Sequence, residues 1–252
     1  MWAKDRHHRI LALLAAREQV SMENLAEEFG VSRETLRRDI VQLEAEGRLK
    51  RVFGGFMRVD GTEPPFQSRM ATNAEAKRRI GAAAARLVRP GMMVAVDAGS
   101  TTIAFAEYLA SIPKLQVITN SLGVAGAVSK GGHAEVILLG GRLGSDVPGT
   151  FGEIALAQLR RFHPDFAFIS PSALDAQAGA MNFDQAEADI ARTMSECAER
   201  LVVLADGSKL GCKSRVQICD CESIHTLITD RKAKPADTDP LCAAGVRNLV
   251  RA

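Results

Sequence analysis

Cysteine is scarce in this sequence, and neither sign of charge dominates. Five cysteines occur among 252 residues, and 32 basic against 30 acidic side chains leave a formal charge of +2. No apolar run reaches the ~18 residues of a transmembrane helix, so we expect no membrane span. The composition, with 46% hydrophobic and 25% charged residues, also argues against disordered, collagen-like and disulfide-rich proteins. So small a total charge gives no hint of nucleic acid as a partner.

The cysteines and histidines show no metal-binding spacing. All five cysteines lie in the last quarter of the chain without paired C-x-x-C units, and the five histidines are scattered. Neither a G-x-x-x-x-G-K-[ST] loop nor a G-x-G-x-x-G fingerprint is present. We therefore expect reduced, incidental thiols in a cytoplasmic protein that holds no metal and no cofactor.

The chain changes character at residues 58–74. This stretch contains Gly61, Pro64 and Pro65 and shows no sustained hydrophobic period, which is typical of a linker. We expect one domain at residues 1–57 and a second at residues 75–252.

Three short helical patterns precede this linker. They span residues 5–17, 22–29 and 33–46. Ser21 and Ser32 are suitable N-caps, and Gly30 and Gly47 are suitable helix ends. Residues 49–58 read as two strands joined by glycines. Three helices and a small hairpin predict a winged helix-turn-helix.

Helices alternate with short apolar strands after the linker. The predicted helices are 75–88, 101–110, 121–130, 152–161 and 186–199, and the predicted strands are 92–96, 116–118, 135–139, 166–169, 201–205 and 225–228. The strands are nearly continuous apolar runs, as in a parallel sheet buried on both faces. The pattern predicts a three-layer, Rossmann-like α/β domain with a mostly parallel sheet.

The third helix carries the first functional signal. If Leu36, Ile40 and Leu43 face the core, the helical period turns the residues between them outward. Arginine can bridge guanine or hold a phosphate, and hydroxyl groups can contact bases or backbone. The glycines of the hairpin suit a close approach to the DNA backbone. The candidate contacts to double-stranded DNA are Ser32, Arg33, Thr35, Arg37, Arg38, Gln42, Lys50, Arg51, Gly54 and Gly55.

Polar groups follow the strands of the second domain. In an open parallel sheet, ligands bind outside the carboxyl ends of the strands. The helix that starts after Gly99 offers free N–H groups to a phosphate, and Lys209 can add a positive charge. Asp and Asn side chains suit sugar hydroxyls. The candidate residues for a phosphorylated sugar or polyol are Asp97, Gly99, Ser100, Thr101, Thr102, Thr119, Asn120, Ser121, Gly141, Arg142, Asp206 and Lys209.

These motifs resemble those of the DeoR family. Residues 31–40 (VSRETLRRDI) and 51–55 (RVFGG) are similar to its helix-turn-helix signature. Residues 97–102 (DAGSTT), 119–121 (TNS), 139–141 (LGG), 187–188 (EA), 206–209 (DGSK) and 227–230 (LITD) resemble its sugar-phosphate-sensing domain. Two positions depart from the family pattern, because Ala76 precedes Lys77 where Glu is usual and Phe56 follows the glycines where Ala is common.

The resemblance implies a bacterial transcriptional regulator, usually a repressor of sugar or polyol catabolism. Such a repressor leaves its operator when a phosphorylated intermediate binds a sensor domain that is similar in fold to ribose-5-phosphate isomerase. We expect a homo-oligomer, a dimer or a tetramer, and not an enzyme. Two alternatives stay open at this point. One is an isomerase with Asp97 or Asp206 as general base, and the other is a sensor that acts only through protein partners.

The small total charge hides a local excess of basic groups. Residues 1–60 carry 11 basic and 10 acidic side chains, but residues 31–58 carry seven basic and four acidic ones. Acidic groups gather instead on the second helix, at Glu23, Glu27 and Glu28. We infer that charge is sorted by face within the first domain.

Overall fold

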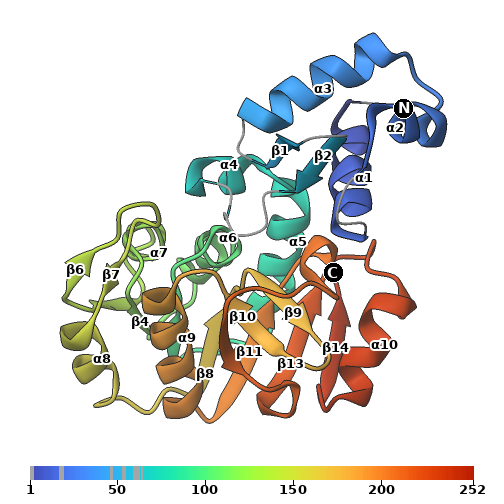
Figure 1. The fold of residues 1–252 in the computed structure, drawn as a ribbon. Helices are drawn as coiled ribbons and strands as arrows, with labels where there is room; N and C mark the ends of the chain where they lie inside the picture. The colour runs from blue at the N-terminus through green and yellow to red at the C-terminus, as the bar shows by residue number, and fades with distance from the viewer. Residues whose placement is uncertain (1–2, 17–19, 46–47, 53–54, 59–62, 64) are drawn as a thin grey trace. The chain divides into compact units, whose positions relative to one another are not determined.

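The computed structural model describes residues 3–16, 20–45, 48–52, 55–58, 63 and 65–252. The chain divides into two compact units, residues 1–64 and 65–252, shown in Figure 1. We call them the N-terminal unit and the C-terminal unit and describe each by itself. Gly47 and Gly54, which the sequence suggests as a helix end and a DNA contact, lie outside the described residues.

The N-terminal unit has the predicted helices and hairpin. Its elements are α1 (Ala3–Ala16), α2 (Met22–Phe29), α3 (Arg33–Ala45), β1 (Leu49–Val52) and β2 (Gly55–Arg58). The Ser21 side chain accepts a bond from the N–H of Asn24, and Gly30 ends α2 in the left-handed conformation with φ of 59°. Ser32 Oγ likewise accepts the N–H of Thr35 at the start of α3. Strands β1 and β2 pair antiparallel.

One face of each helix forms the core of the N-terminal unit. The buried apolar side chains of α1, α2 and α3 include Ile10, Leu25, Leu36, Ile40 and Leu43, all fully buried. The spacing of the three α3 residues confirms the predicted inward face of that helix.

A buried polar contact ties α1 to α3 inside this core. Asp39 accepts hydrogen bonds from Arg6, including one of 2.9 Å from Nη2, and lies 2.9 Å from His7 Nε2. The Asp39 side chain is only 6% exposed. Burial by itself would raise its pKa, but the bonds from Arg6 and His7 prevail and lower it.

The C-terminal unit is built on a parallel sheet. Within the described residues its order is β14-β13-β11-β8-β3-β4-β5, and every adjacent pair is parallel. The strands are β3 (Met93–Val96), β4 (Gln116–Thr119), β5 (Glu135–Leu138), β8 (Phe166–Ile169), β11 (Arg200–Leu204), β13 (Ile224–Thr229) and β14 (Asn248–Arg251). The sheet confirms the predicted α/β class.

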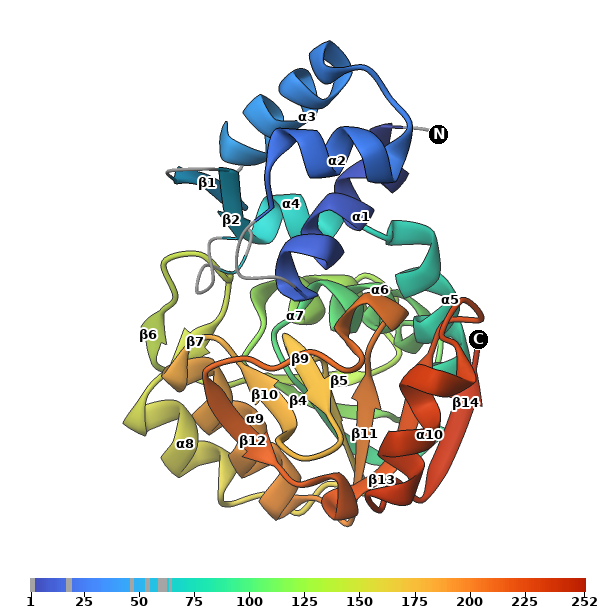
Figure 2. The same ribbon diagram turned by 45° about the vertical axis from the view of Figure 1, so that its right-hand side comes forward.

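Helices cover both faces of this sheet (Figures 1 and 2). They are α5 (Ala74–Ala85), α6 (Ser100–Leu109), α7 (Leu122–Ser129), α8 (Glu153–Leu159), α9 (Gln185–Cys197) and α10 (Pro235–Ala243), and the short helix α4 (Phe66–Ala71) precedes them in the chain. Val94 and Val96 of β3 pack with α5, α6 and α7, whereas Ala95 between them packs in the cluster that contains α8 and α9. Strand residues therefore alternate between two apolar layers, which explains the continuous apolar runs in the sequence.

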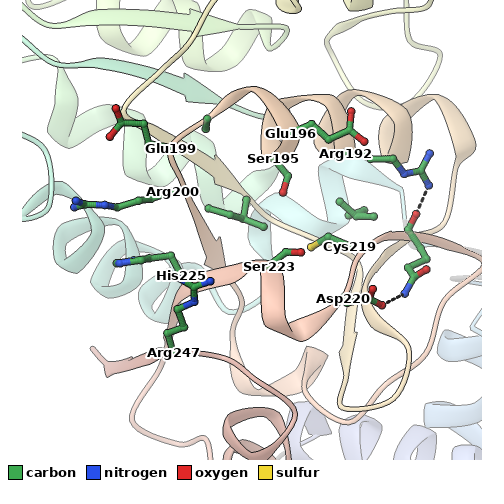
Figure 3. A pocket seen from close by; sticks show the side chains of 14 residues that line it. Arg192, Ser195, Glu196, Glu199, Arg200, Cys219, Asp220, Ser223, His225 and Arg247 are labelled. Atoms are coloured by element: carbon green, nitrogen blue, oxygen red, sulfur yellow. Dashed lines mark hydrogen bonds between the residues drawn. The ribbon is translucent and has the colours of Figure 1, made fainter.

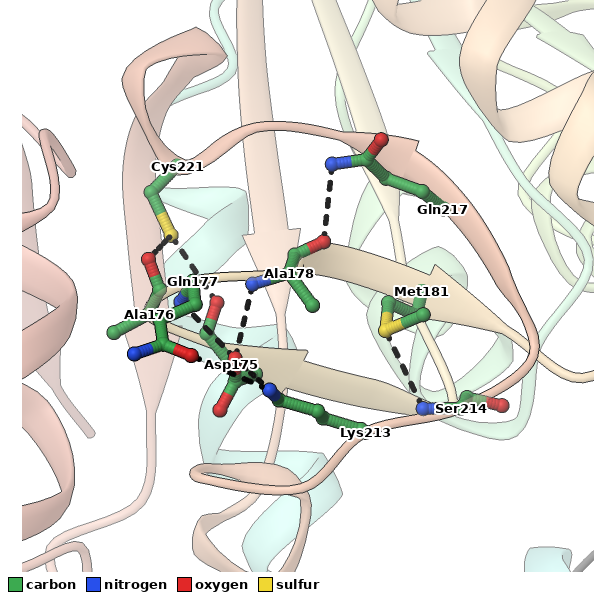
Figure 4. A network of polar contacts seen from close by, with 9 residues as sticks. All are labelled: Asp175, Ala176, Gln177, Ala178, Met181, Lys213, Ser214, Gln217 and Cys221. Carbon is green, nitrogen blue, oxygen red and sulfur yellow. Dashed lines mark hydrogen bonds and ion pairs between the residues drawn. The ribbon is translucent and has the colours of Figure 1, made fainter.

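A second, smaller sheet lies in the cluster with α8 and α9. It consists of β9 (Ala173–Asp175), β10 (Gly179–Asn182) and β12 (Val216–Cys219), in the order β12-β10-β9. Figure 4 shows the contacts that join its turn to the segment before β12. Asp175 accepts the N–H groups of Gln177 and Ala178, and Gln217 Nε2 donates to the carbonyl of Ala178 over 3.1 Å.

Sequence patterns do not reveal every element. The small sheet, the two-stranded pair β6 (Arg142–Leu143) and β7 (Thr150–Phe151), α10 and β14 are absent from the predicted set. These strands have two to four residues, which mix apolar residues with polar residues or glycine instead of forming the apolar runs of the main strands. Helix α10 contains Pro240, which obscures its pattern.

The predicted linker, residues 58–74, contains α4. Phe66 at its start is 4% exposed and belongs to the core cluster of the C-terminal unit. A six-residue helix after two prolines shows less than two helical turns in the sequence, so only the burial of Phe66 in tertiary structure distinguishes it from a loop.

The contact between Asp39 and α1 yields a prediction about stability. Asp39→Ala leaves the guanidinium of Arg6 buried without its carboxylate, and the free energy of unfolding of the N-terminal unit should fall by about 3 kcal/mol. Glu34→Ala is the matched control, since Glu34 pairs with Arg38 on the exposed face of the same helix and should cost under ~1 kcal/mol. Hydrogen exchange of the α3 core amides in the full chain measures both values, and equal losses would contradict the prediction.

Candidate functional sites

The outer face of α3 carries the predicted DNA contacts. Arg33, Arg37, Arg38 and Gln42 are exposed, and Thr35 is half-buried. Asp39 lies on the opposite face with Arg6, so its charge is removed from the basic surface. Arg37 forms no ion pair with any residue that the structure describes.

Other arginines of this surface pair with nearby acids. Arg33 lies 3.4 Å from Glu23, and Arg38 lies 3.6 Å from Glu34. In both pairs the side chains are more than 60% exposed. Exposed pairs of this kind contribute little stability, so a phosphate can replace the carboxylate at small cost.

The hairpin contributes Arg51 and Gly55. Arg51 Nε donates to Glu44 at the end of α3 over 3.2 Å, and its guanidinium lies over the ring of Phe56. A Cβ atom on Gly55 would lie 2.4 Å from the carbonyl oxygen of Val20, so packing against the chain before α2 already requires this glycine. Lys50 lies in β1, but its side chain is outside the described residues.

The C-terminal unit brings polar groups to one edge of its sheet. We call the carboxyl ends of β3, β4, β8 and β11 the rim. The chain runs from β3 through β4 to β5 and then returns to β8 on the other side of β3, so the strand order reverses between β3 and β8. Parallel α/β sheets bind ligands at such a reversal. Asp97, Asn120, Ser170 and Asp206 follow the four rim strands.

The loop after β3 opens helix α6. Gly99 is the N-cap, and Ser100, Thr101 and Thr102 form the buried first turn, whose N–H groups have no partner within the helix. Thr102 Oγ1 donates to the carbonyl of Gly99 over 2.9 Å. Thr101 Oγ1 is buried and has no hydrogen-bond partner among the described residues. A Cβ on Gly99 would lie 3.2 Å from Ser170 Cβ, so the loops after β3 and β8 are in close contact.

Some polar side chains in the segment after β4 already form hydrogen bonds within the protein. Thr119 Oγ1 donates to the carbonyl of Val96 over 2.6 Å, and Ser121 Oγ caps α7 by accepting the N–H of Val124. Asn120 is fully buried, and its Nδ2 donates to the carbonyl of Thr150 over 3.3 Å. Its Oδ1 has no partner among the described residues, so Asn120 has spare hydrogen-bonding capacity for a ligand.

Lys209 reaches the rim from the segment after β11. It ends the short 3-10 helix η1 (Gly207–Lys209), and its Nζ donates to Ser170 Oγ over 3.3 Å and to the carbonyl of Pro171 over 2.5 Å. Gly211 donates its N–H to the carbonyl of Leu174 in β9 over 2.8 Å, so the small sheet holds this segment in place. Lys209 is thereby next to the loop that opens α6.

Lys77 is a rim residue that the site prediction omits. It lies in α5, is 5% exposed, and donates a hydrogen bond from Nζ to the carbonyl of Arg69. Burial and the positive charges of Lys209 and Arg69 lower its pKa to about 8, although Asp206 opposes the shift. The resemblance to the DeoR pattern marks Lys77 as part of a motif at a helix start, but nothing in the helical period indicates that α5 turns it toward Lys209.

The two rim aspartates differ in their ionisation. Burial raises the pKa of Asp97 to about 7, against the opposing influence of the Ala98 N–H and Lys209. Burial also acts on Asp206, but Lys209 and the hydrogen bonds from Ser208 outweigh it and lower the pKa of that carboxyl. The rim thus combines one carboxyl that titrates near neutral pH with one that stays ionised.

Gly141 and Arg142 lie at the β6–β7 pair and not at the rim. Arg142 is exposed in β6 and pairs with Phe151 of β7. A Cβ on Gly141 would lie 2.6 Å from the carbonyl oxygen of Phe151, which explains the glycine by packing alone. No contact of the Arg142 side chain with the rim appears among the described residues.

A cavity of about 370 Å³ lies at the opposite end of the strands (Figure 3). Arg200 and His225 at its wall belong to the starts of β11 and β13, and Arg247 precedes β14. Burial, Arg200 and Arg247 together lower the pKa of His225. None of the predicted ligand-binding residues lines this cavity, and ligands of parallel sheets bind at the other edge.

The part of the chain that the structure describes shows no group of three His, Cys, Asp or Glu residues placed to hold a metal ion. The five cysteines are not paired in disulfides. No helix within the described ranges is long and apolar enough to cross a membrane.

Comparisons with solved structures give weak likenesses. Ribose 5-phosphate isomerase A from Methanocaldococcus jannaschii matches with a TM-score of 0.41 and 17% identity, over 55% of each chain. The translation initiation factor eIF-2B of Pyrococcus horikoshii OT3 matches with a TM-score of 0.43 and 15% identity, over 86% of this chain and 77% of the other. TM-scores this low do not establish a shared fold.

Sequence comparisons are far more informative. The transcriptional repressor GlcR of Bacillus subtilis is 32% identical over 252 residues, which cover 99% of this chain and 97% of the relative. The glycerol-3-phosphate regulon repressor of Escherichia coli K12 is 30% identical over 90% of each chain. The transcriptional regulator GlpR of Haloferax volcanii is 32% identical over 98% of this chain and 97% of its own. Relatives of this kind favour a regulator over the alternative of an isomerase.

Two family models together span most of the chain. The DeoR-like helix-turn-helix domain matches residues 6–62, and the DeoR C-terminal sensor domain matches residues 72–231. The first contains the basic face of α3, and the second contains every rim strand. The chain therefore belongs to the DeoR family of DNA-binding transcriptional regulators.

Proposed function

We propose that this chain is a transcriptional repressor whose α3 and hairpin bind operator DNA and whose rim binds a phosphorylated sugar or polyol that releases it. The observation that carries the effector assignment is a pair of lysines, the buried Lys77 and the half-buried Lys209, beside an open helix N-terminus. The charge of Lys209 helps burial to lower the pKa of Lys77, and Lys209 contacts the Ser170 loop that abuts Gly99. Two ammonium groups and the first turn of α6 form a site for a dianion.

The remaining rim groups suit the hydroxyls of such a ligand. Thr101 Oγ1 and Asn120 Oδ1 are buried without partners among the described residues, and a bound polyol supplies them. Asp206 is an ionised acceptor, and Asp97 can act as donor or acceptor because it titrates near neutral pH. A phosphate with neighbouring hydroxyls matches this set better than an inorganic anion alone.

The relatives agree with this ligand class. One of them is by its name a repressor of a glycerol-3-phosphate regulon, and glycerol 3-phosphate is a phosphorylated polyol. We assign repression, operator DNA and a cytoplasmic location to this chain on the same basis. By linkage, the effector weakens DNA binding only if it binds the DNA-incompetent state more tightly. Reading of two operator half-sites requires a homo-oligomer.

Removal of the outward arginines of α3 tests the DNA interface. Arg37→Ala and Arg38→Ala should each weaken binding to a duplex selected by the wild-type protein from a random pool, by about 10-fold, and lower the salt dependence of the affinity. Fluorescence anisotropy at several salt concentrations measures both effects. Arg79→Ala, which removes an exposed arginine of α5, is the control. Wild-type affinity in both α3 variants would contradict this interface.

Removal of Lys209 tests the effector site. A thermal-shift screen against phosphorylated sugars and polyols should identify a compound that raises the melting temperature of the wild-type protein. Lys209→Ala should bind that compound at least ~10-fold more weakly, since a charged hydrogen bond is lost, and should keep its affinity for DNA. Lys213→Ala, an exposed lysine of the same segment, is the control. If no phosphorylated compound shifts the melting temperature, the rim assignment is wrong.

The pKa of Asp97 gives a stability test with a defined sign. An unfolded Asp ionises near pH 4, whereas folded Asp97 does so near pH 7, so wild-type stability should fall as pH rises between these values, by about 1.4 kcal/mol per pKa unit. Asp97→Asn carries no titrating group, so its stability relative to wild type should increase from pH 5 to pH 8. Thermal melts of both proteins and of Glu75→Gln, an exposed control, measure the trend. A difference in melting temperature between wild type and Asp97→Asn that does not change with pH would refute this prediction.

A further inference from the structure

Helix α4 is the first helix of the C-terminal unit. In the sequence it follows Pro64 and Pro65 and comes directly after the DNA-binding domain. The Phe66 side chain is buried in the core of the C-terminal unit. The stretch predicted as a linker thus ends in a helix that belongs to the sensor.

The start of α4 is held by Asp146. The two carboxylate oxygens of Asp146 accept the N–H of Phe66 over 3.0 and 3.1 Å, and Arg69 Nη2 donates to Oδ2 over 3.2 Å. Asp146 lies in the segment between β6 and β7, residues 144–149, which we call the β6–β7 loop. Within this loop Val147 is 3% exposed, so the loop packs firmly.

The β6–β7 loop is joined to the rim at Asn120. The Leu122 N–H donates to the carbonyl of Pro148 over 3.1 Å, and the Thr150 N–H donates to the carbonyl of Asn120 over 2.8 Å. A Cβ on Gly149 would lie 2.9 Å from that carbonyl oxygen, so the loop and the segment after β4 are in close contact. Through Asp146, the start of α4 is therefore connected to the Asn120 side of the rim.

The end of α4 is held by the other side of the rim. Asn73, two residues beyond α4, donates from Nδ2 to Asp206 Oδ1 over 3.0 Å. Lys77 Nζ donates to the carbonyl of Arg69, in the last turn of α4. These contacts connect α4 to the pair of lysines and to Asp206.

A bound ligand competes for these same groups. A phosphate accepts a charge-assisted hydrogen bond from Lys77, which is stronger than the bond that Lys77 gives to a backbone carbonyl. Sugar hydroxyls donate to Asp206 and compete with the amide of Asn73. A ligand that binds the Asn120 side chain also contacts the segment after β4, to which the β6–β7 loop is hydrogen-bonded. A ligand in the rim therefore competes directly for the contacts at the end of α4, whereas it reaches the start of α4 only through Asn120 and the β6–β7 loop.

We propose that α4 is the element through which the rim controls DNA affinity, with Asp146 and Asn73 as the positioning residues that hold it in the DNA-competent arrangement of the free protein. This inference rests on the proposed effector site at the rim. It assigns a role to the β6–β7 loop and to the end of the predicted linker, which DNA and effector contacts leave unexplained.

The test uses two variants that interrupt the two ends separately. Asp146→Ala removes the acceptor for Phe66 and Arg69. Asn73→Gly removes the amide but tolerates the left-handed backbone at this position, where φ is 53°. Glu75→Gln is the matched control, because Glu75 pairs with Arg79 on the exposed face of α5 and makes no hydrogen bond or ion pair with α4 or the rim among the described residues. Melting temperature and circular dichroism of the full chain report whether each variant folds.

Two readouts in the full chain decide the matter. The first is affinity for the selected duplex with and without the compound found in the thermal-shift screen. In wild type the two affinities should differ by a factor within the ~5–150-fold range of ordinary coupling, and in both variants this factor should fall at least ~3-fold toward 1. The second is hydrogen exchange of the backbone amides of residues 66–72. In wild type this exchange should become faster when the compound is added. In the two variants it should already be faster than in wild type when no compound is present.

The outcomes separate this inference from the proposed function. If the compound binds wild type and its coupling factor is unchanged in both variants, α4 is not the coupling element. If no phosphorylated compound binds, the effector assignment is wrong, and α4 is then judged without ligand. In that case both variants should bind the duplex at least ~3-fold more weakly than wild type and Glu75→Gln, and equal affinities would overturn the inference. A variant that loses its fold is replaced by Asp146→Asn or Asn73→Asp, judged by the same readouts.

Discussion

The parallel pairing of β3 with both β4 and β8 is the constraint on which the C-terminal unit depends. Parallel strands end at the same edge, and the chain returns from β5 to β8 across β3, so residues from distant segments are brought to one place. Asp97, Asn120 and Ser170 follow these three strands, and the neighbouring β11 adds Asp206 and then Lys209. Two apolar layers above and below the sheet keep this edge in a fixed arrangement, because the apolar residues of the central strands are buried against helices on both sides.

Electrostatics in the two units follow one physical rule with opposite results. In the N-terminal unit, the buried Asp39 has Arg6 and His7 of α1 as hydrogen-bond partners, so its pKa falls and its charge is kept away from the basic outer face of α3. In the C-terminal unit, the Ala98 N–H and the charge of Lys209 do not offset the burial of Asp97, and its pKa rises toward neutrality. Burial disfavours the charged form in both cases, and the nearby donors decide the outcome.

Much of the fold and part of the site follow from sequence patterns alone. Helices α2 and α3 begin at the capping residues Ser21 and Ser32, α2 ends at Gly30, and the main strands of the C-terminal unit are apolar runs, so local chemistry predicts these elements. The residues after those strands are also predictable, because the carboxyl edge of a parallel sheet is where ligands bind. Arg142 shows the limit of this reasoning, since it follows β5 yet is exposed in a β6–β7 pair. The strands of the small sheet and the β6–β7 pair are too mixed in composition to form an apolar run, and Pro240 obscures the helical period of α10.

By itself the sequence determined the winged helix-turn-helix, the α/β class, the outward face of α3 and most of the rim, because each depends on local periodicity, capping or the ends of strands. Only the tertiary structure decided that Lys77 of α5 joins Lys209, that Asp39 turns inward to Arg6, and that α4 lies within the predicted linker with both ends held by rim segments. These contacts join residues up to 133 positions apart in the sequence, as for Asn73 and Asp206. No local pattern specifies such pairs, since they arise from the way helices and loops pack around the sheet.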